Sequence, residues 1–145
     1  MQEKSDKIVI RLENVMRVYW MGVERIHALD GVSLELRENE YVAVMGPSGS
    51  GKSTLINVLG CLDRVTSGCY VLDGENTTRM GDSALARVRN ERIGFVFQSF
   101  ELLSRSSALK NVEMPLIYSR DGWWSRRKRA AHMLQRVGLG DRIKH

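Results

Sequence analysis

Hydrophobic and polar residues alternate with the period of β-strands over the first part of the chain. An imperfect alternation predicts a strand over Ile8–Val15, and a regular one predicts another over Val32–Leu36. Tyr41–Met45 is a short apolar run with β-branched residues, and Gly46-Pro47 ends it. This run predicts a third strand, followed by a glycine-rich break.

The pattern then changes to a helical period. Lys52–Leu62 is predicted to be a helix whose apolar residues form one stripe facing the core. Beyond it, Tyr70–Leu72 predicts a strand, Asp82 is expected to cap a helix through Asn90, and Ile93–Phe97 predicts an apolar strand. Strands and helices therefore alternate, which is typical of an α/β fold.

The last third of the chain is predicted to be helical. Ala108–Tyr118 has helical character but contains Pro115, which must end or kink it. Ser125 is expected to cap a final helix that Gly138 stops. The residues on the apolar face of that helix are Ala130, Met133, Leu134 and Val137.

Composition places the chain among ordinary soluble globular proteins. It has 145 residues, of which 43% are hydrophobic and 27% charged, which excludes a disordered or collagen-like chain. No apolar run approaches the roughly 18 residues of a membrane span, and Met1–Lys7 is too polar for a signal peptide. We therefore expect a cytoplasmic protein in which Cys61 and Cys69 are small apolar residues, without a role in metal binding.

The net charge of +5 is concentrated near the C-terminus. Residues 1–118 carry 14 Lys/Arg against 15 Asp/Glu, whereas residues 119–145 carry 8 against 2. The basic run Arg126–Arg129 follows Trp123 and Trp124. Such a run is more often a solvated helix face than a contact with nucleic acid or a lipid surface, so we expect no nucleic-acid partner.

Residues 46–54 carry the clearest chemical signal. They read Gly-Pro-Ser-Gly-Ser-Gly-Lys-Ser-Thr and match the phosphate-loop pattern G-x-x-x-x-G-K-S/T between a predicted strand and a predicted helix. Backbone N–H groups surround phosphate oxygens only where side chains are absent, which explains the three glycines. The expected nucleotide-binding residues of this loop are Gly46, Ser48, Gly49, Ser50, Gly51, Lys52, Ser53 and Thr54.

The end of the loop predicts the cofactors ATP and Mg²⁺. The Lys52 ammonium is expected to reach the β and γ phosphates, and the Ser53 hydroxyl to bind Mg²⁺. Thr54 is a donor to the α phosphate in this interpretation, and the helix that starts near Lys52 adds the positive end of its dipole. A glycine-rich turn with a solvated lysine is the alternative, which the agreement of spacing, strand and helix disfavours.

The loop sequence resembles that of ABC transporter ATPase subunits. Tyr19 resembles the aromatic residue that stacks on adenine in that family, and a strand-edge tyrosine is the alternative. Gln98, after Gly94–Phe97, resembles the glutamine that completes the Mg²⁺ shell and senses the γ phosphate. The resemblance implies a P-loop NTPase of the ABC ATPase type, incomplete, with an N-terminal antiparallel β part and a C-terminal helical part.

Several further stretches are similar to the lipoprotein-release and macrolide-export branch of this family. Asn39 and Val65 depart from the branch in a minor way, and neither is expected to touch the phosphates. The similar stretches are residues 60–63, 66–68, 94–98 with Leu102 and Leu103, and 111–116.

The motifs that family members use to cleave ATP are missing from these 145 residues. The sequence contains no Ser-Gly-Gly segment and no Asp-Glu dipeptide, and none of its three histidines follows a suitable strand. The resemblance therefore implies that residues 1–145 are the N-terminal portion of a single nucleotide-binding domain, truncated before the signature motif, Walker B and switch histidine. We expect nucleotide binding without efficient hydrolysis by this chain alone, and apolar strands left uncovered.

The implied function is that of an ATP-binding subunit that powers export or extraction of a substrate through a membrane permease. The implied partners are that permease, which residues 98–115 would contact, and a second ATPase subunit at the inner face of the cell membrane. Three alternatives stay open: a catalytically inactive nucleotide-binding module or sensor, an interaction protein that uses Arg126–Arg129, and a P-loop kinase.

Overall fold

The computed structural model of the protein describes residues 6–97, 99, 102–119 and 122–145. The chain divides into two compact units, which span residues 1–94 and 95–145. Each unit has its own hydrophobic core. Within the described ranges, no helix combines the length and the apolar character that crossing a bilayer requires.

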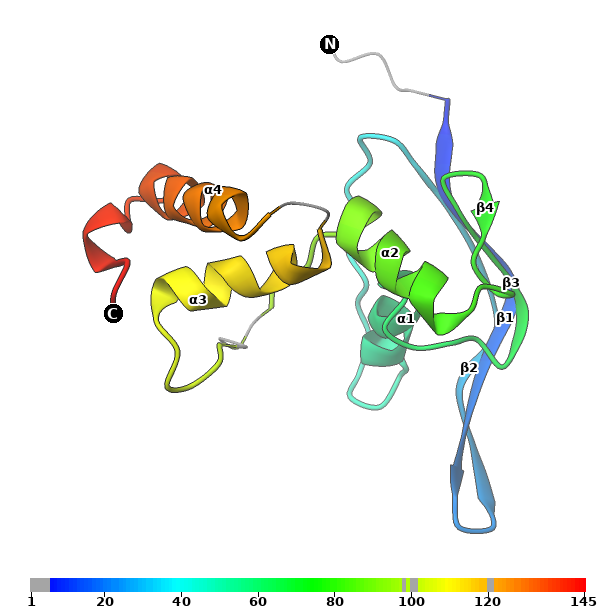
Figure 1. Ribbon diagram of the computed structural model, residues 1–145. Coiled ribbons are helices and arrows are strands. Elements are labelled where there is room, and N and C mark those ends of the chain that lie inside the picture. The colour runs from blue at the N-terminus through cyan, green and yellow to red at the C-terminus, as the bar shows by residue number, and fades with distance from the viewer. Residues whose placement is uncertain (1–5, 98, 100–101, 120–121) are drawn as a thin grey trace. The chain divides into compact units, whose positions relative to one another are not determined.

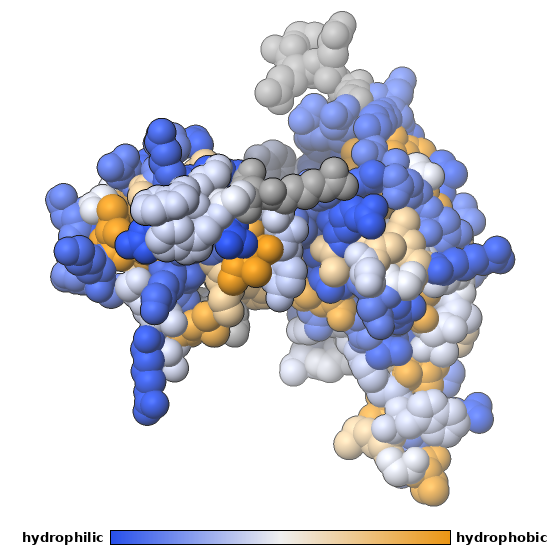
Figure 2. Space-filling view, in the orientation of Figure 1, coloured by the Kyte–Doolittle hydropathy of each residue, from blue (hydrophilic) through white to orange (hydrophobic). Residues whose placement is uncertain are grey.

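The first unit is built on a four-stranded antiparallel sheet with the order β2-β1-β3-β4 (Figure 1). β1 and β2 form a long hairpin that extends beyond both predicted strands and turns at Gly22, whose φ is 61°. Apolar side chains gather at the tip of this hairpin (Figure 2), where Trp20, Met21 and Val23 are exposed. The strands are β1 Ile8–Met21, β2 Glu24–Arg37, β3 Ser67–Leu72 and β4 Glu75–Asn76.

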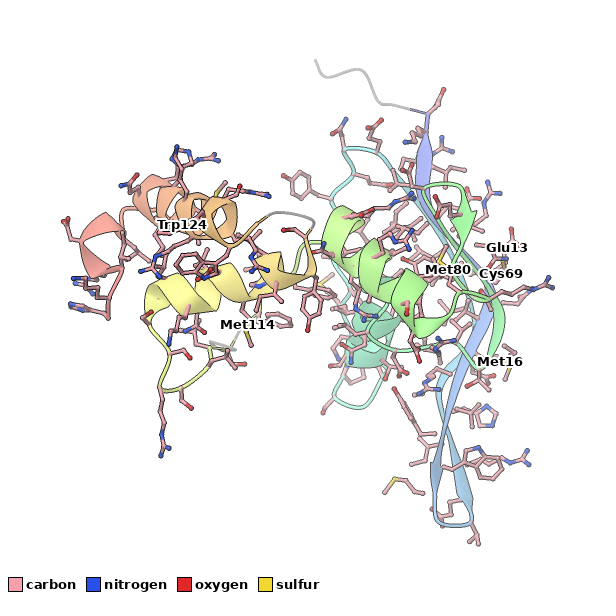
Figure 3. All side chains as sticks on the ribbon, in the orientation of Figure 1. Glu13, Met16, Cys69, Met80, Met114 and Trp124 are labelled. Atoms are coloured by element: carbon pink, nitrogen blue, oxygen red, sulfur yellow. The ribbon has the colours of Figure 1, made fainter. Side chains whose placement is uncertain are left out.

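A β-bulge explains why the alternation along β1 is imperfect. The register between β1 and β2 shifts between Leu12 and Val15, and Asn14 has a φ of 47°. Because β1 carries one extra residue there, Leu12 and Val15 both reach the core although they lie three residues apart, and they are 1% and 0% exposed. Glu13 pairs with Cys69 of β3 beside the bulge (Figure 3).

Two helices pack on one face of this sheet. α1 Lys52–Leu59 contributes Val58 to the core, and α2 Asp82–Arg92 contributes Leu85 and Val88 (Figure 1). Both helices were predicted, but the N-cap of α2 is Gly81, so the prediction of Asp82 as the cap is wrong. Asp82 instead lies in the first turn, where the negative charge of its carboxylate interacts favourably with the positive end of the helix dipole.

Two predicted strands do not form. Tyr41–Met45 and Ile93–Phe97 pair with no strand in the part of the chain that the structure describes. Tyr41 is 101% exposed and Val96 is 102% exposed. Both segments have the apolar composition of central strands, but a strand needs a hydrogen-bonding partner beside it, and the described residues supply none there.

The second unit is helical, as predicted. Pro115 lies at the start of the 3₁₀ helix Met114–Tyr118, which directly follows α3 Ala108–Glu113, so the predicted end of the α-helix near Pro115 is confirmed. α4 Trp123–Arg136 packs against α3 through Leu109, Ala130 and Leu134, and a short 3₁₀ helix, Gly140–Arg142, follows it.

The ends of α4 test two predicted signals. The N-cap is Gly122, and Ser125 lies inside the helix, so the prediction that Ser125 caps it is wrong. Gly138 ends the helix as predicted: its φ is 75°, and the N–H of Leu139 donates to the Leu134 carbonyl oxygen at 2.8 Å. This hydrogen bond satisfies a carbonyl that the helix leaves without a partner.

Candidate nucleotide-binding site

The phosphate loop connects segment 41–45, which lies in no strand or helix, to the start of α1. Gly49 and Gly51 have φ angles of 81° and 85°, in the left-handed region that disfavours residues with a Cβ. A Cβ at Gly51 would also lie 2.3 Å from the carbonyl oxygen of Ala28 in β2. Two separate features therefore require glycine at position 51: its positive φ and the close approach of β2.

Lys52 closes the loop from within. Its Nζ donates hydrogen bonds to the carbonyl oxygens of Gly46 at 2.8 Å and Pro47 at 2.6 Å, and it lies 3.4 Å from the Ser50 hydroxyl. The loop therefore wraps around its own ammonium group. The positive charge of the ammonium lies at the centre of the loop, where it is available to bind an anion with several negatively charged oxygens.

The first turn of α1 adds backbone donors and two hydroxyls. Gly51 is the N-cap residue, and its carbonyl accepts the N–H of Leu55 at 2.8 Å. The N–H groups of Lys52, Ser53 and Thr54 precede this first intrahelical bond, so the helix leaves them available. Ser53 is exposed and Thr54 is half-buried. This end of the helix also lacks acidic side chains, which would repel phosphate.

Tyr19 lies on β1, paired with Ile26 of β2, and its side chain has specific partners. Its hydroxyl donates a hydrogen bond of 2.5 Å to Oδ2 of Asp63, and the Arg17 guanidinium carbon lies 4.4 Å from its ring centroid. Arg17 also binds Asp63 directly, through Nη2 at 2.7 Å and Nε at 2.9 Å. Arg17, Tyr19 and Asp63 thus form one connected cluster, here named the Tyr19 cluster.

The charge of Asp63 is stabilised within this cluster. Partial burial raises the pKa of Asp63, but hydrogen bonds from Tyr19, the backbone N–H of Arg64 and the Arg17 guanidinium outweigh it and hold the pKa below its ordinary value. The carboxylate is consequently ionised at neutral pH and remains an acceptor for the Tyr19 hydroxyl.

Of the remaining predicted site residues, the structure describes those of the phosphate loop but not Gln98. Gln98 lies outside the described residues. The loop residues from Gly46 to Thr54 are contiguous and mostly exposed. Sequence reasoning missed the roles of Arg17 and Asp63 as partners of Tyr19. The spacing of Arg17 two residues before Tyr19 was the available local signal.

Other chemistry is sparse in the part of the chain that the structure covers. Those residues contain no group of three or more His, Cys, Asp or Glu side chains placed to hold a metal ion. Cys61 is buried, and this burial raises the pKa of its thiol. On α4, Trp123 and Trp124 contact each other edge to face, and the Arg127 guanidinium lies 5.7 Å from the Trp123 ring.

Sequence comparison relates the chain to transporter ATPases. The family model described as ABC transporter matches residues 29–145. An uncharacterized ABC transporter ATP-binding protein of Thermotoga maritima is 53% identical over 139 residues, which cover 96% of this chain and 59% of that protein. The macrolide export ATP-binding/permease protein MacB of Brucella abortus is 47% identical over 137 residues, which cover 94% of this chain and 21% of that protein.

Two solved structures share the fold. The dimeric structure of MJ0796, a bacterial ABC transporter cassette, matches with a TM-score of 0.81 and 45% identity, over 94% of this chain and 60% of that one. A second structure, the post-hydrolysis state of the MJ0796 cassette bound to ADP and Pi, matches with a TM-score of 0.79 and 44% identity. The chain thus spans about 60% of the length of the cassette it matches.

Proposed function

The chain belongs to the ABC transporter family, as the resemblance of its sequence predicted, and from this premise we propose that it binds ATP together with Mg²⁺ at residues 46–54. Its fold is that of the ABC ATPase cassettes, which confirms the predicted fold class. The observation that carries the proposal is the loop wrapped around the Lys52 ammonium at the N-terminus of α1.

The donor set of this loop fits a polyphosphate. Lys52 exchanges its two carbonyl acceptors for phosphate oxygens, which form stronger, charge-assisted hydrogen bonds. The N–H groups at the start of α1 and the helix dipole add further stabilisation of negative charge. The absence of a side chain at Gly51 preserves the close packing of the loop end against β2.

The same turn fits a magnesium ion shared with the nucleotide. Ser53 directly follows Lys52 and exposes a hydroxyl, the ligand type that Mg²⁺ accepts alongside phosphate oxygens and water. Bound Mg²⁺ supplies positive charge that offsets the charge of the phosphates. Gln98 is the second proposed ligand, and Thr54 is the proposed donor to the α phosphate.

The base is assigned to Tyr19. An aromatic ring on a strand offers a stacking surface that tolerates different bases and is worth about 1 to 3 kcal/mol. The proposal therefore divides recognition into a charged part at the loop and an aromatic part at Tyr19. Ser48 and Ser50 are proposed to complete the loop between the three glycines.

Equilibrium binding of labelled ATP tests this function directly. We expect saturable binding that strengthens when Mg²⁺ is added and that unlabelled inorganic tripolyphosphate competes away, because the loop recognises the phosphate chain. ATP binding that is neither strengthened by Mg²⁺ nor reduced by tripolyphosphate would mean that the nucleotide binds elsewhere, and would overturn the assignment.

We further propose that both units belong to one nucleotide-binding domain of a transporter, because the family model extends across both. MacB of Brucella abortus is named as an ATP-binding/permease protein, and the matched cassette is described as dimeric. By analogy, the proposed partners are a permease and a second ATPase subunit, at the cytoplasmic face of the cell membrane, and the proposed role is to power export.

A hydrolysis assay distinguishes this role from that of a sensor. The chain alone is expected to bind ATP without appreciable turnover, because it contains no Asp-Glu pair to polarise an attacking water. Turnover restored by adding a chain that carries a signature loop and Walker B carboxylates supports the transporter ATPase. Unchanged binding with no turnover in that mixture supports the inactive nucleotide-binding module.

A further inference from the structure

We infer that Arg17 and Asp63 are positioning residues for the nucleotide base, because they hold the Tyr19 ring so that a base stacks on the face that Arg17 does not cover. The inference rests on the proposed function, since it requires ATP to bind at the phosphate loop. It assigns a shared role to two residues that lie 46 positions apart in the sequence.

The contacts of the Tyr19 cluster fix the ring at two separate places, one face and the hydroxyl. The guanidinium of Arg17 lies 4.4 Å from the ring centroid and covers one face by a cation–π contact. The hydroxyl at the end of the ring is held at 2.5 Å by Oδ2 of Asp63. A tyrosine has only two side-chain torsions, so a bound face and a bound tip together leave the ring little freedom to rotate.

Asp63 is itself held in place, so it serves as a firm anchor. Its Oδ2 accepts a hydrogen bond from Nε of Arg17, and its Oδ1 contacts Nη2 of the same guanidinium. Oδ1 also accepts a hydrogen bond from the backbone N–H of Arg64 at 2.8 Å. The side chains of Arg17 and Asp63 are only 22% and 21% exposed, which shields the pair from solvent. A half-buried ion pair with these additional hydrogen bonds holds its side chains more firmly than an exposed surface ion pair does.

The position of Asp63 connects the two parts of the proposed site. Asp63 follows α1, and α1 begins at the phosphate loop. The turn between them is fixed to the helix, since the N–H groups of Leu62 and Asp63 both donate to the Asn57 carbonyl oxygen. The Tyr19 ring is therefore tied, through one carboxylate, to the same helix that presents the loop. A ring ordered before binding loses less entropy when the base arrives.

The test compares ATP with inorganic tripolyphosphate, which keeps the phosphate chain and lacks the base. Affinities for both ligands are measured with Mg²⁺ for the unsubstituted chain, Asp63→Ala, Tyr19→Leu and the double variant. Asp63→Ala is expected to weaken ATP binding by about tenfold, a value within the range of one stacked base, and to leave tripolyphosphate binding unchanged. In the Tyr19→Leu background, Asp63→Ala is expected to have no further effect, because Asp63 acts through the ring.

A matched control and two outcomes keep the inference falsifiable. Glu35→Ala removes a different ion pair of β1, between Glu35 and Arg11 at 2.8 Å, and is expected to change neither affinity. Equal loss of both ligands in Asp63→Ala, or an additive loss in the double variant, would mean a general structural role and overturn the inference. Tighter ATP binding by Arg17→Met would also overturn it, because the guanidinium would then compete with the base for the ring.

The failure of the proposed function looks different. If the unsubstituted chain binds neither ATP nor tripolyphosphate, the phosphate loop assignment fails and takes this inference with it. If the chain binds both ligands equally and Tyr19→Leu changes neither affinity, the loop assignment stands and the positioning role of Arg17 and Asp63 is refuted.

Discussion

The Nζ atom of Lys52 lies 2.6 Å from the carbonyl oxygen of Pro47. This contact shows how the loop keeps its shape, because the Lys52 ammonium also donates to the Gly46 carbonyl oxygen and so holds two consecutive carbonyl groups of the turn. A site that is already formed loses less entropy on binding than one that must order itself. The loop therefore presents its charge and its free N–H groups together.

Lys52→Ala is expected to weaken ATP binding by about 100-fold or more. The substitution removes an ammonium that would make at least two charge-assisted hydrogen bonds to phosphate, and such bonds are worth about 1.5 to 3 kcal/mol each. Equilibrium binding of labelled ATP at fixed Mg²⁺ and salt measures the effect. Lys110→Ala, which removes an exposed lysine of α3, is the matched control and is expected to bind as the unsubstituted chain does. Unaltered binding by Lys52→Ala would count decisively against the loop.

Gly51→Ala is expected to destabilise the protein more than Gly49→Ala. Both residues have positive φ, so alanine costs about 1 to 2 kcal/mol at either position. At Gly51 the new Cβ would also lie 2.3 Å from the Ala28 carbonyl oxygen, whereas at Gly49 it meets no atom within 4 Å. Relieving that overlap is expected to add about 1 to 3 kcal/mol. Urea unfolding of the two variants gives the comparison, and an equal loss would refute the close approach of the loop to β2.

The contribution of Asp63 to stability is expected to depend on pH. Its pKa is lower in the folded chain than the ordinary value of 3.8. The charged carboxylate therefore stabilises the fold fully above pH 3.8, and this stabilisation is lost as the pH falls through the lowered pKa of the folded state.

The measurement compares the unsubstituted chain with Asp63→Asn. The free energy of unfolding is expected to be lower in Asp63→Asn at neutral pH, and the difference between the two proteins should shrink as the solution is acidified below pH 3.8. A difference that stays constant across that range would show that the Arg17 and Tyr19 contacts do not depend on the charge of Asp63.

Local signals made the phosphate loop and its helix predictable. The glycines, the lysine and the apolar stripe of α1 act within a few residues of one another, and the loop geometry follows from them. The strands were harder to predict because they depend on partners. β1 and β2 extend well past the alternating stretches, since pairing with each other satisfies their backbone, while Tyr41–Met45 and Ile93–Phe97 have the composition of strands but no neighbour among the described residues.

The Tyr19 cluster marks the limit of sequence reasoning for this site. Tyr19 was identified through resemblance alone, and nothing in the spacing of residues indicates that its hydroxyl meets Asp63, 44 positions later. Asp63 lies in residues 60–63, which resemble one branch of the family, but the resemblance assigns no role to this carboxylate. Only the fold, which brings β1 beside the turn that follows α1, reveals what that carboxylate contacts.

Tyr70→Phe is expected to lower the free energy of unfolding by about 1 to 3 kcal/mol. Tyr70 is 2% exposed, and its hydroxyl donates at 2.7 Å to the carbonyl oxygen of Leu59, the last residue of α1. Burial raises the pKa of Tyr70, so the hydroxyl keeps its proton and remains a donor at neutral pH. Phenylalanine fills the same space but leaves that carbonyl without this partner, and an unsatisfied acceptor in this partly buried position carries a penalty of about this size.

Urea unfolding checks this anchor between β3 and the helix that bears the loop. The midpoint is expected to fall while the slope stays unchanged, because the substitution alters stability without altering the surface exposed on unfolding. Tyr118→Phe removes the hydroxyl of an exposed tyrosine and serves as the matched control, with no expected change. If both variants unfold at the midpoint of the unsubstituted chain, the Tyr70 hydroxyl does not hold the end of α1, and the orientation of the helix must come from its apolar contacts with the sheet alone.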